Sequence, residues 1–330
     1  MNTPSATDAP SRKFIKELGE NEKIDQVFLL HEKQLRQNRN GNLYLLTRLA
    51  DKTGTVTAML WNAKEDTGHN VNNGDYVRVT GATQIFNGSL QIIAQAVAPA
   101  EAGTYAEDDF VAFSVERRDE LLAELREALG SIRHVHLREL ANLFLNDTSF
   151  MEKFATAPAA IKNHHAHLGG LLEHVVSLLA VANWIGSHYE ALDRDLLVMG
   201  TFLHDIGKVD ELSYERDLAY TDEGQLVGHL VMGVTLLERK LDEYAAQQPA
   251  PFPDDVAMHL RHMIVSHHGK LEFGSPKLPM TLEAMALSYI DDLDAKINTM
   301  VGLIDEDMNT ESAWTSFNPN LARKLYKGRS

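Results

Sequence analysis

Histidine and aspartate side chains recur through the second half of the chain in an order that suits a metal site. Imidazole nitrogens and carboxylate oxygens bind borderline and hard divalent cations. The candidate ligands are one His, an adjacent His-Asp pair, one His, two adjacent His and one Asp: His174, His204, Asp205, His229, His267, His268 and Asp291. Because successive groups stand roughly 24 to 38 residues apart, no single helix can supply them, and several elements must converge.

Each of these residues also has an ordinary structural interpretation. A lone His near a helix end commonly caps the helix or packs in the core, and the chain has 15 His in total, so single ones carry little information. An Asp close to a Gly, as in Asp205 and Gly207, commonly closes a helix. The hypothesis of a metal site therefore depends on the ordered set.

The elements that must position this set are helical. From about residue 110 the apolar residues follow a helical period, clearly so at 119–125, and helices are predicted to about residue 304. Glycine, proline and polar stretches predict the interruptions: Gly186, Gly207, 213–225, 249–253 and 269–279. Each candidate ligand then lies on a predicted helix or at a helix end.

The first third of the chain has a different pattern. Short runs rich in β-branched and aromatic residues alternate with Gly and Asn turns between residues 23 and 97. The predicted strands are 43–46, 55–61, 76–80, 84–86 and 90–93. Asn87-Gly88, between the last two, is a strong hairpin signal. Five short strands in this span predict a small closed barrel.

Composition places the chain among globular proteins. Of its 330 residues, 44% are hydrophobic and 24% charged, and no long uninterrupted apolar run predicts a membrane span. The N-terminal segment lacks the apolar stretch of a signal peptide. The absence of cysteine excludes disulfides, thiolate zinc ligands and cysteine nucleophiles. We therefore expect a cytoplasmic protein.

The net charge of −16 is unevenly distributed. Residues 1–100 contain 11 Lys and Arg against 10 Asp and Glu, whereas the remaining 230 contain 20 against 37. The acidic part can attract divalent cations, and the nearly neutral first part need not repel a polyanion. Most of these carboxylates are ordinary solubilising charges.

The order of the ligands, with His-Asp-x-Gly-Lys intact at 204–208, resembles the HD phosphohydrolases over about 150–300. The resemblance implies that the core metal ligands are His174, His204, Asp205 and Asp291. It implies a second metal position completed by His229 and His267, with His268 as a substitute or neighbour. Two divalent cations are then expected, with Mn²⁺ preferred and Mg²⁺, Fe²⁺ or Co²⁺ as alternatives.

Such a centre hydrolyses phosphate esters. A divalent cation lowers the pKa of bound water towards neutrality, and two cations about 3.5–4 Å apart hold the phosphate oxygens during in-line displacement. Asp205 is therefore expected at the catalytic centre, and Lys208 is placed to neutralise charge on the phosphoryl group. The alternative for Lys208 is a cation that stabilises a helix C-terminus. Glu173 and Asp294 are candidates to orient the imidazoles.

The predicted barrel resembles an OB-fold, and the run 44–61 is similar to those of OB domains that bind nucleic acid. The barrel followed by the HD pattern, over about 20–327, resembles the YhaM family of bacterial 3′–5′ exoribonucleases. The segments that carry this resemblance are 158–174, 220–229, 266–276 and 289–296. It implies stepwise removal of nucleotides from single-stranded RNA by a metal-activated water, with single-stranded DNA as an alternative substrate.

Barrels of this type bind single strands by stacking bases on aromatic side chains along a positive groove. The candidate substrate contacts in the barrel are Tyr44, Trp61, Arg36 and Arg39. The candidate phosphate contacts shortly before the first metal ligand are Lys162, His164 and His165. The alternative is that these aromatic residues belong to the barrel core and that the basic residues are ordinary loop residues.

We therefore predict a multidomain α and β chain, in which a five-stranded OB-fold β-barrel precedes an all-α HD-domain helical bundle. The expected parts are a disordered lead at 1–15, the barrel at 16–100, a linker at 101–110, the HD domain at 111–305 and a C-terminal tail at 306–330. The tail either packs on the bundle or extends the nucleic-acid path. A homo-oligomer is a further possibility, although no sequence feature specifies an interface.

Other functions remain open at this point. One is hydrolysis of small nucleotides, either triphosphates or cyclic dinucleotides, although the Gly-Tyr-Pro signature of the cyclic-dinucleotide group does not follow His267-His268. Another is a nucleic-acid-binding protein with a non-catalytic HD scaffold, although no candidate ligand is missing. A di-iron oxygenase would also be consistent with the candidate ligands, but that function would not explain the presence of the barrel.

Overall fold

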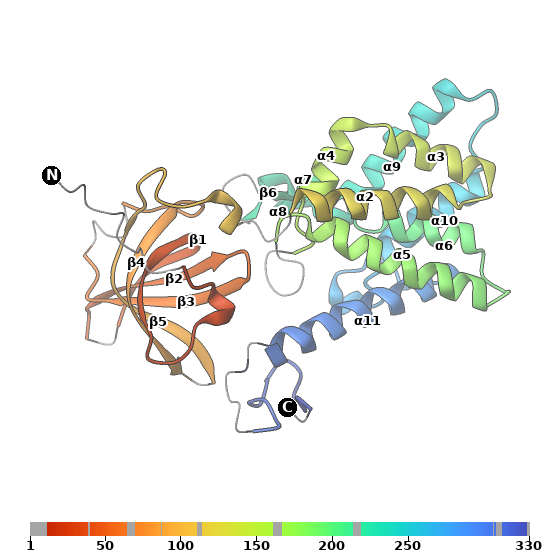
Figure 1. Cartoon of the computed structure of the whole chain (residues 1–330). Helices are drawn as coiled ribbons and strands as arrows, with labels where there is room; N and C mark the ends of the chain where they lie inside the picture. The colour runs from red at the N-terminus through yellow and green to blue at the C-terminus, as the bar shows by residue number, and fades with distance from the viewer. Residues whose placement is uncertain are drawn as a thin grey trace. The chain divides into compact units, whose positions relative to one another are not determined.

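The computed structural model describes residues 12–38, 40–64, 70–86, 88–110, 114–160, 167–213, 219–305, 307 and 312–328. The chain forms two compact units (Figure 1). Residues 1–112 and 304–330 make up the barrel unit, and residues 113–303 make up the helical unit. The predicted order of a five-stranded barrel followed by a helical bundle is confirmed.

The barrel closes in the strand order β1-β2-β3-β5-β4, with β4 paired back onto β1. Only β3 and β5 run parallel among these pairs, which is the Greek-key arrangement of an OB-fold. The strands are β1 (Lys23–Gln37), β2 (Leu43–Asp51), β3 (Gly54–Trp61), β4 (Tyr76–Phe86) and β5 (Ser89–Pro99). Closure leaves no free edge for pairing with another chain.

Alternating apolar residues form the barrel core. Its fully buried members include Phe28, Leu30, Leu49, Val77, Val79 and Ile92. The predicted strands 76–80 and 84–86 are one strand, β4, with a bulge between Thr80 and Gly81. A Cβ at Gly81 would lie 2.2 Å from the backbone oxygen of Ile93, so the bulge requires glycine. The strand β1 is absent from the predicted set because polar residues interrupt its alternation.

The C-terminal segment 312–328 folds back on itself within the barrel unit. Trp314 pairs with Tyr326, and the backbone N–H of Thr315 donates to the carbonyl of Leu325 at 2.9 Å. Thr315 and Leu325 are buried, whereas Trp314 and Tyr326 are about half exposed. The segment therefore belongs to the barrel unit rather than to the bundle.

The helical unit consists mainly of helices that alternate with short connections. They are α2 (Val115–Gly130), α3 (Val135–Leu145), α4 (Thr148–Thr156), α5 (Gly170–His188), α6 (Arg194–Leu203), α7 (Lys208–Glu211), α8 (Asp222–Val227), α9 (His229–Gln247), α10 (Asp254–Ser266) and α11 (Leu282–Asp305). The short 3₁₀ helices η1 (Ile15–Glu17) and η2 (Glu107–Asp109) belong to the barrel unit, and η3 (Leu271–Phe273) follows α10. Side chains that accept from the first turn cap α2, α4, α6 and α8.

The helical core is continuous and dominated by aromatic and aliphatic side chains. Phe144, Phe150, Phe154 and Phe202 form a cluster of edge-on and stacked rings at its centre. Two details differ from the prediction. Gly186 lies within the last turn of α5 rather than ending it, and the predicted loop 213–225 contains the start of α8 and a two-stranded sheet of β6 (Leu212–Ser213) and β7 (Ala219–Tyr220).

One helix among the described residues, α5, is long and apolar enough to cross a membrane. Half of its apolar window is buried inside the protein, and Leu171, Leu172, Val175, Leu178 and Leu179 contribute to the core. The apolar character of α5 is therefore that of a central bundle helix.

A half-buried carboxylate, that of Asp195, joins the connection after α2 to the start of α6. Asp195 accepts from the backbone N–H groups of Arg133 and His134 at 2.6 and 2.8 Å, and from Arg194 Nη1 at 2.7 Å. Burial by itself would raise the pKa of Asp195, but these donors outweigh it and lower the pKa below the usual value. The ionised form is thus the one that the fold stabilises.

Replacing Asp195 by Ala should lower the free energy of unfolding of the helical unit by about 0.5–1.5 kcal/mol at neutral pH, because two partly solvent-accessible backbone donors lose their acceptor. Since the folded pKa lies below the unfolded value of about 3.9, this contribution is present above that value and is lost as the pH falls. Denaturant unfolding from pH 3 to pH 7 should show the difference shrinking in acid. The exposed Asp119→Ala variant is the control, and a pH-independent difference would contradict the account.

Candidate metal centre

The seven candidate ligands come together from five helices or helix ends. His174 lies in the second turn of α5, and His204 and Asp205 follow the last residue of α6. His229 begins α9, the His267-His268 pair follows α10, and Asp291 lies within α11. Their donor atoms form three overlapping groups, each with all atoms within 4.8 Å of one another.

The Asp205 carboxylate occupies the centre of the cluster and faces imidazoles on both sides. Its Oδ2 lies 3.8 Å from His174 Nε2 and 3.3 Å from His204 Nε2. Its Oδ1 lies 3.6 Å from His229 Nε2 and 3.5 Å from His267 Nε2. One carboxylate therefore contributes an oxygen to each of two separate groups of nitrogens.

Asp291 belongs to the group around Oδ2 and also approaches the other side. Its Oδ1 lies 3.3 Å from His174 Nε2. It also shares a group of close donor atoms with His204 and His267. The two sides thus have different chemistry, one containing both carboxylates and the other mainly imidazoles.

Every imidazole in the cluster is held through its outer nitrogen. The Nδ1 atoms of His204, His267 and His268 donate to the backbone carbonyls of Thr201, Ile264 and Phe273 at 2.7, 2.8 and 2.9 Å. Those of His174 and His229 donate to Asp294 and Glu211 at 3.0 and 2.9 Å. Because a carbonyl oxygen only accepts, the Nδ1 of each carbonyl-bound ring carries the proton. In the neutral rings all five Nε2 lone pairs then face the cluster.

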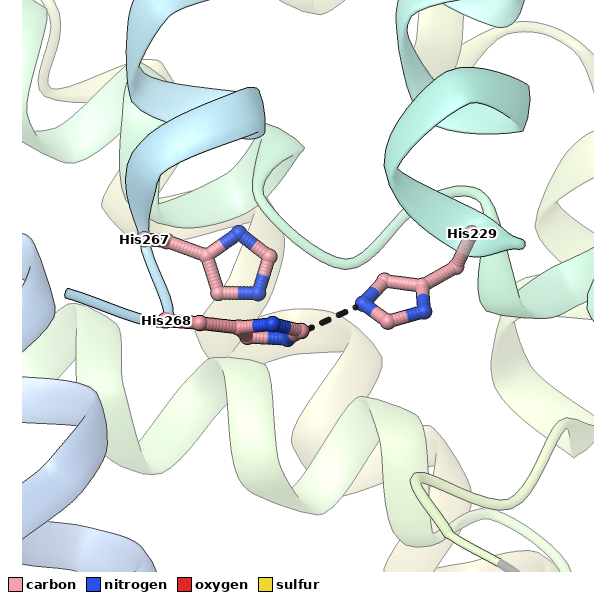
Figure 2. A group of neighbouring side chains, drawn as sticks. All are labelled: His229, His267 and His268. Carbon is pink, nitrogen blue, oxygen red and sulfur yellow. Dashed lines mark hydrogen bonds between the residues drawn. The ribbon is translucent and has the colours of Figure 1, made fainter. Parts of the chain in front are cut away.

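Figure 2 shows the imidazole-rich side, where His229, His267 and His268 converge from α9 and the end of α10. The Nε2 atoms of His229 and His268 lie 3.3 Å apart. Both rings donate through Nδ1 elsewhere, so in their neutral form these atoms direct lone pairs at each other. A cation between them would turn this repulsion into coordination.

Buried side-chain atoms that lack a hydrogen-bond partner indicate that these residues fit a divalent cation. Among the described residues, His204 Nε2 and Asp205 Oδ1 are buried side-chain atoms without a hydrogen-bond partner. A buried polar atom without a partner costs about 1–3 kcal/mol, yet two occur here on adjacent residues, one in each of the two groups of donor atoms. Borderline nitrogen and hard oxygen donors in one cluster are the donor set of a divalent metal site.

The electrostatics differ between the two sides. Burial lowers the pKa of His174, but the carboxylates of Asp291 and Asp294 outweigh burial and raise it to about 9. Burial and the neighbouring His204 lower the pKa of His267 to about 4. The carboxylate side therefore attracts positive charge, whereas His267 is neutral at pH 7 and available as a nitrogen donor.

Lys208 is part of the cluster rather than a surface cation at a helix C-terminus. It is the first residue of α7, and its Nζ lies 2.7 Å from Asp205 Oδ2. Burial opposes its charge, but Asp205 outweighs burial and raises the pKa of Lys208 above its usual value. The ammonium thus lies directly beside the central carboxylate.

The glycine of the His-Asp-x-Gly-Lys motif has a packing role. A Cβ at Gly207 would lie 2.1 Å from the backbone oxygen of His229 and 2.7 Å from the nitrogen of Gly233. Only glycine lets the start of α7 approach the first turn of α9 this closely. The motif therefore positions His229 as well as its own His and Asp.

Sequence reasoning missed Glu211, which anchors His229. Its Oε1 accepts from both the backbone N–H and the Nδ1 of His229, each at 2.9 Å. Glu211 is buried, although as the last residue of a short helix it resembles an ordinary acidic surface residue in the sequence. Of the two residues predicted to orient imidazoles, Asp294 contacts His174, and Glu173 contacts His167 instead.

The structure describes three of the residues that the sequence predicts as substrate contacts, and all three lie in the barrel. Arg36, Tyr44 and Trp61 lie in one row across β1, β2 and β3, since Arg36 pairs with Tyr44 and Tyr44 with Trp61. The Tyr44 and Trp61 rings have centroids 5.2 Å apart, and Trp61 is 46% exposed. Arg36 and Trp61 are exposed and Tyr44 is half-buried, and none of the three belongs to the buried barrel core. The remaining predicted substrate contacts lie outside the described residues: Arg39, Lys162, His164 and His165.

Comparisons with known proteins agree with both units. A model of the HD domain matches residues 171–296, and a model of the OB-fold nucleic acid binding domain matches residues 30–100. The chain is 35% identical over 282 residues to the 3′–5′ exoribonuclease YhaM of Bacillus subtilis (strain 168), covering 84% of this chain and 87% of that protein. The chain belongs to the YhaM family.

Other similar proteins include the 3′–5′ exoribonuclease YhaM of Geobacillus sp. (strain WCH70), 34% identical over 278 residues, which cover 84% of this chain and 83% of that protein. A solved structure of the second OB-fold domain of replication protein A from Methanococcus maripaludis matches 28% of this chain and 98% of that chain, with 24% identity and a TM-score of 0.21. The resemblance to the YhaM family predicted from the sequence is therefore confirmed.

Proposed function

We propose that this protein shortens single-stranded RNA from its 3′ end by metal-dependent hydrolysis of phosphodiester bonds. The observation that carries the proposal is the buried Asp205 carboxylate, which faces two imidazoles through each of its oxygens. The direction and the RNA substrate follow from membership in a family whose named members are 3′–5′ exoribonucleases.

We assign two cation positions, one on each side of Asp205. His174, His204 and Asp291 would complete the position at Oδ2, whereas His229, His267 and His268 would complete the position at Oδ1. Mn²⁺ is the proposed ion because the site combines imidazole nitrogens with carboxylate oxygens, and Mg²⁺ prefers oxygen alone. A bound divalent cation would lower the pKa of a water molecule and polarise a phosphoryl oxygen.

The chain's own residues would position the phosphodiester and compensate its charge. Lys208 Nζ lies beside Asp205 and is held charged by it, so it can neutralise charge that develops on a phosphoryl oxygen. The carbonyl and carboxylate partners of the imidazoles fix the donor atoms before substrate arrives. Burial of His204 and Asp205 excludes bulk water, which strengthens each of these electrostatic interactions.

The barrel would hold the single strand that feeds this centre. The row of Arg36, Tyr44 and Trp61 provides two adjacent rings for base stacking, one exposed and one half-buried, with a cation beside them for the backbone. Further phosphate contacts proposed from the sequence alone are Arg39, Lys162, His164 and His165. Because the proposed substrate is RNA, we infer that the protein acts in the cytoplasm.

With Mn²⁺, a single-stranded RNA labelled at its 5′ end should shorten progressively and release mononucleotides. Asp205→Asn should slow this reaction by more than about 100-fold, because both groups of nitrogens lose their shared carboxylate. Asp242→Asn, an exposed carboxylate on α9, is the matched control and should retain the wild-type rate. Shortening from the 5′ end, cleavage without added metal, or faster turnover of free nucleotides than of RNA would refute the assignment.

Trp61→Ala should weaken binding of single-stranded RNA by about 5- to 150-fold, which corresponds to the loss of one stacked base. The rate at saturating RNA should change little, because Trp61 lies in the barrel unit and not in the metal cluster. Fluorescence anisotropy with Asp205→Asn as the parent measures binding without turnover. Trp184→Ala, another exposed Trp, serves as the control, and equal weakening by both variants would argue against the stacking row.

A further inference from the structure

Two of the five imidazoles in the cluster are held by a side chain and not by a backbone carbonyl. His174 donates through Nδ1 to Asp294 at 3.0 Å. His229 donates through Nδ1 to Glu211 at 2.9 Å. These two rings lie at different oxygens of Asp205, His174 at Oδ2 and His229 at Oδ1. Each cation position therefore has one ligand whose orientation depends on a second side chain, and such partners affect metal affinity.

Glu211 holds His229 at two points with one oxygen. Its Oε1 accepts from the backbone N–H and from the Nδ1 of His229, each at 2.9 Å. The helix α9 begins at His229, and the preceding Gly228 has no side chain with which to cap it. A carboxylate at this end satisfies one of the N–H groups that the helix leaves free and interacts favourably with the helix dipole. The same residue thus fixes the start of α9 and the orientation of its first imidazole.

The segment between α7 and α9 packs against Glu211 and buries it. The backbone carbonyl of Glu211 accepts from the N–H of Thr221 at 2.9 Å and from its hydroxyl at 3.2 Å. A Cβ at Gly224 would lie 2.1 Å from this carbonyl oxygen, so α8 lies directly against it. Glu211 is only 6% exposed. Because water has little access to its carboxylate, the two contacts with His229 are stronger than they would be at the surface.

The contact between His229 and His268 depends on which nitrogen of His229 carries the proton. The Nε2 atoms of the two rings lie 3.3 Å apart, close enough for a hydrogen bond. A proton on His229 Nε2 would donate to His268 Nε2 and occupy both lone pairs, so that neither nitrogen could bind a cation. The Glu211 carboxylate only accepts, and it therefore keeps the proton on Nδ1. With this acceptor in place, both Nε2 lone pairs remain available to a cation.

We propose that Glu211 is a positioning residue that sets the affinity of the cation position at Asp205 Oδ1, by fixing the tautomer and the orientation of His229. The inference rests on the two cation positions of the proposed function. The position at Oδ2 relies instead on Asp294, which holds His174. Glu211 therefore acts on one of the two positions, and its effect reaches the cation through the His229 ring.

Manganese binding in the absence of substrate tests the proposal, and electron paramagnetic resonance measures the unbound ion during a titration. The wild-type chain should bind two Mn²⁺ ions. Glu211→Ala should weaken one of the two by about 10- to 100-fold and leave the other unchanged. Glu211→Gln keeps an acceptor oxygen and should bind this ion more tightly than Glu211→Ala does. Glu223→Ala, which removes an exposed carboxylate on α8, is the matched control and should bind both ions like the wild type.

A double-mutant cycle separates positioning through His229 from a general effect on charge or folding. In a His229→Ala background, Glu211→Ala should cause no further loss of Mn²⁺ affinity, because the ring that Glu211 holds is absent. In an Asp294→Ala background, the same substitution should cause its full loss, because the two carboxylates act on different positions. An undiminished effect of Glu211→Ala without His229, or weakening of both ions by this single substitution, would overturn the proposal.

The tautomer of His229 provides a readout that needs neither metal nor a Glu211 variant. Nitrogen-15 NMR of histidine-labelled, metal-free wild-type protein should place the proton of the neutral ring on Nδ1, and His229→Ala identifies the signals. A proton on Nε2, or unchanged Mn²⁺ affinity in Glu211→Ala, would contradict the role assigned to Glu211. A wild-type chain that binds fewer than two Mn²⁺ ions would refute the two cation positions themselves, and this inference with them.

Discussion

The helical unit is organised around one electrostatic constraint, the burial of the Asp205 carboxylate among imidazoles whose outer nitrogens are already committed. An isolated buried carboxylate costs several kcal/mol, and Lys208 compensates part of this cost through a direct ion pair at 2.7 Å. Its other oxygen faces His229 and His267 without a hydrogen bond. A cation on each side of Asp205 would give the carboxylate oxygens and the imidazole nitrogens the partners that they lack. This accounts physically for the burial of so many polar groups in one place.

The helices meet where they do because the ligands are placed at their ends or first turns. His204 and His267 follow α6 and α10, so the carbonyls of the preceding turn are free to accept from their rings. Glycine at 207 lets α7 approach α9 closely enough to bring His229 into reach. The helix α11 contributes Asp291 and Asp294, which both contact His174, so this helix fixes the first ligand on α5.

Much of this could be predicted from residue type and order, because a pattern of His and Asp at wide spacing has few structural explanations. The seven candidate ligands do lie together, and the barrel followed by a bundle is confirmed. Glu211 could not be predicted, since its sequence context is that of a surface carboxylate. The carbonyl partners leave no mark in the sequence at all, and the division of 76–86 into two strands was wrong because Gly81, which permits a bulge, looks like a turn.

The central claim is that Asp205 bridges two cation positions, and anomalous diffraction from crystals grown with Mn²⁺ tests it most directly. The account predicts two anomalous peaks at the manganese edge, one beside each oxygen of Asp205. His174 and His204 should ligate the first, and His229 and His267 the second. A single peak, or peaks that lack Asp205 as a common ligand, would contradict the two-sided role assigned to this carboxylate.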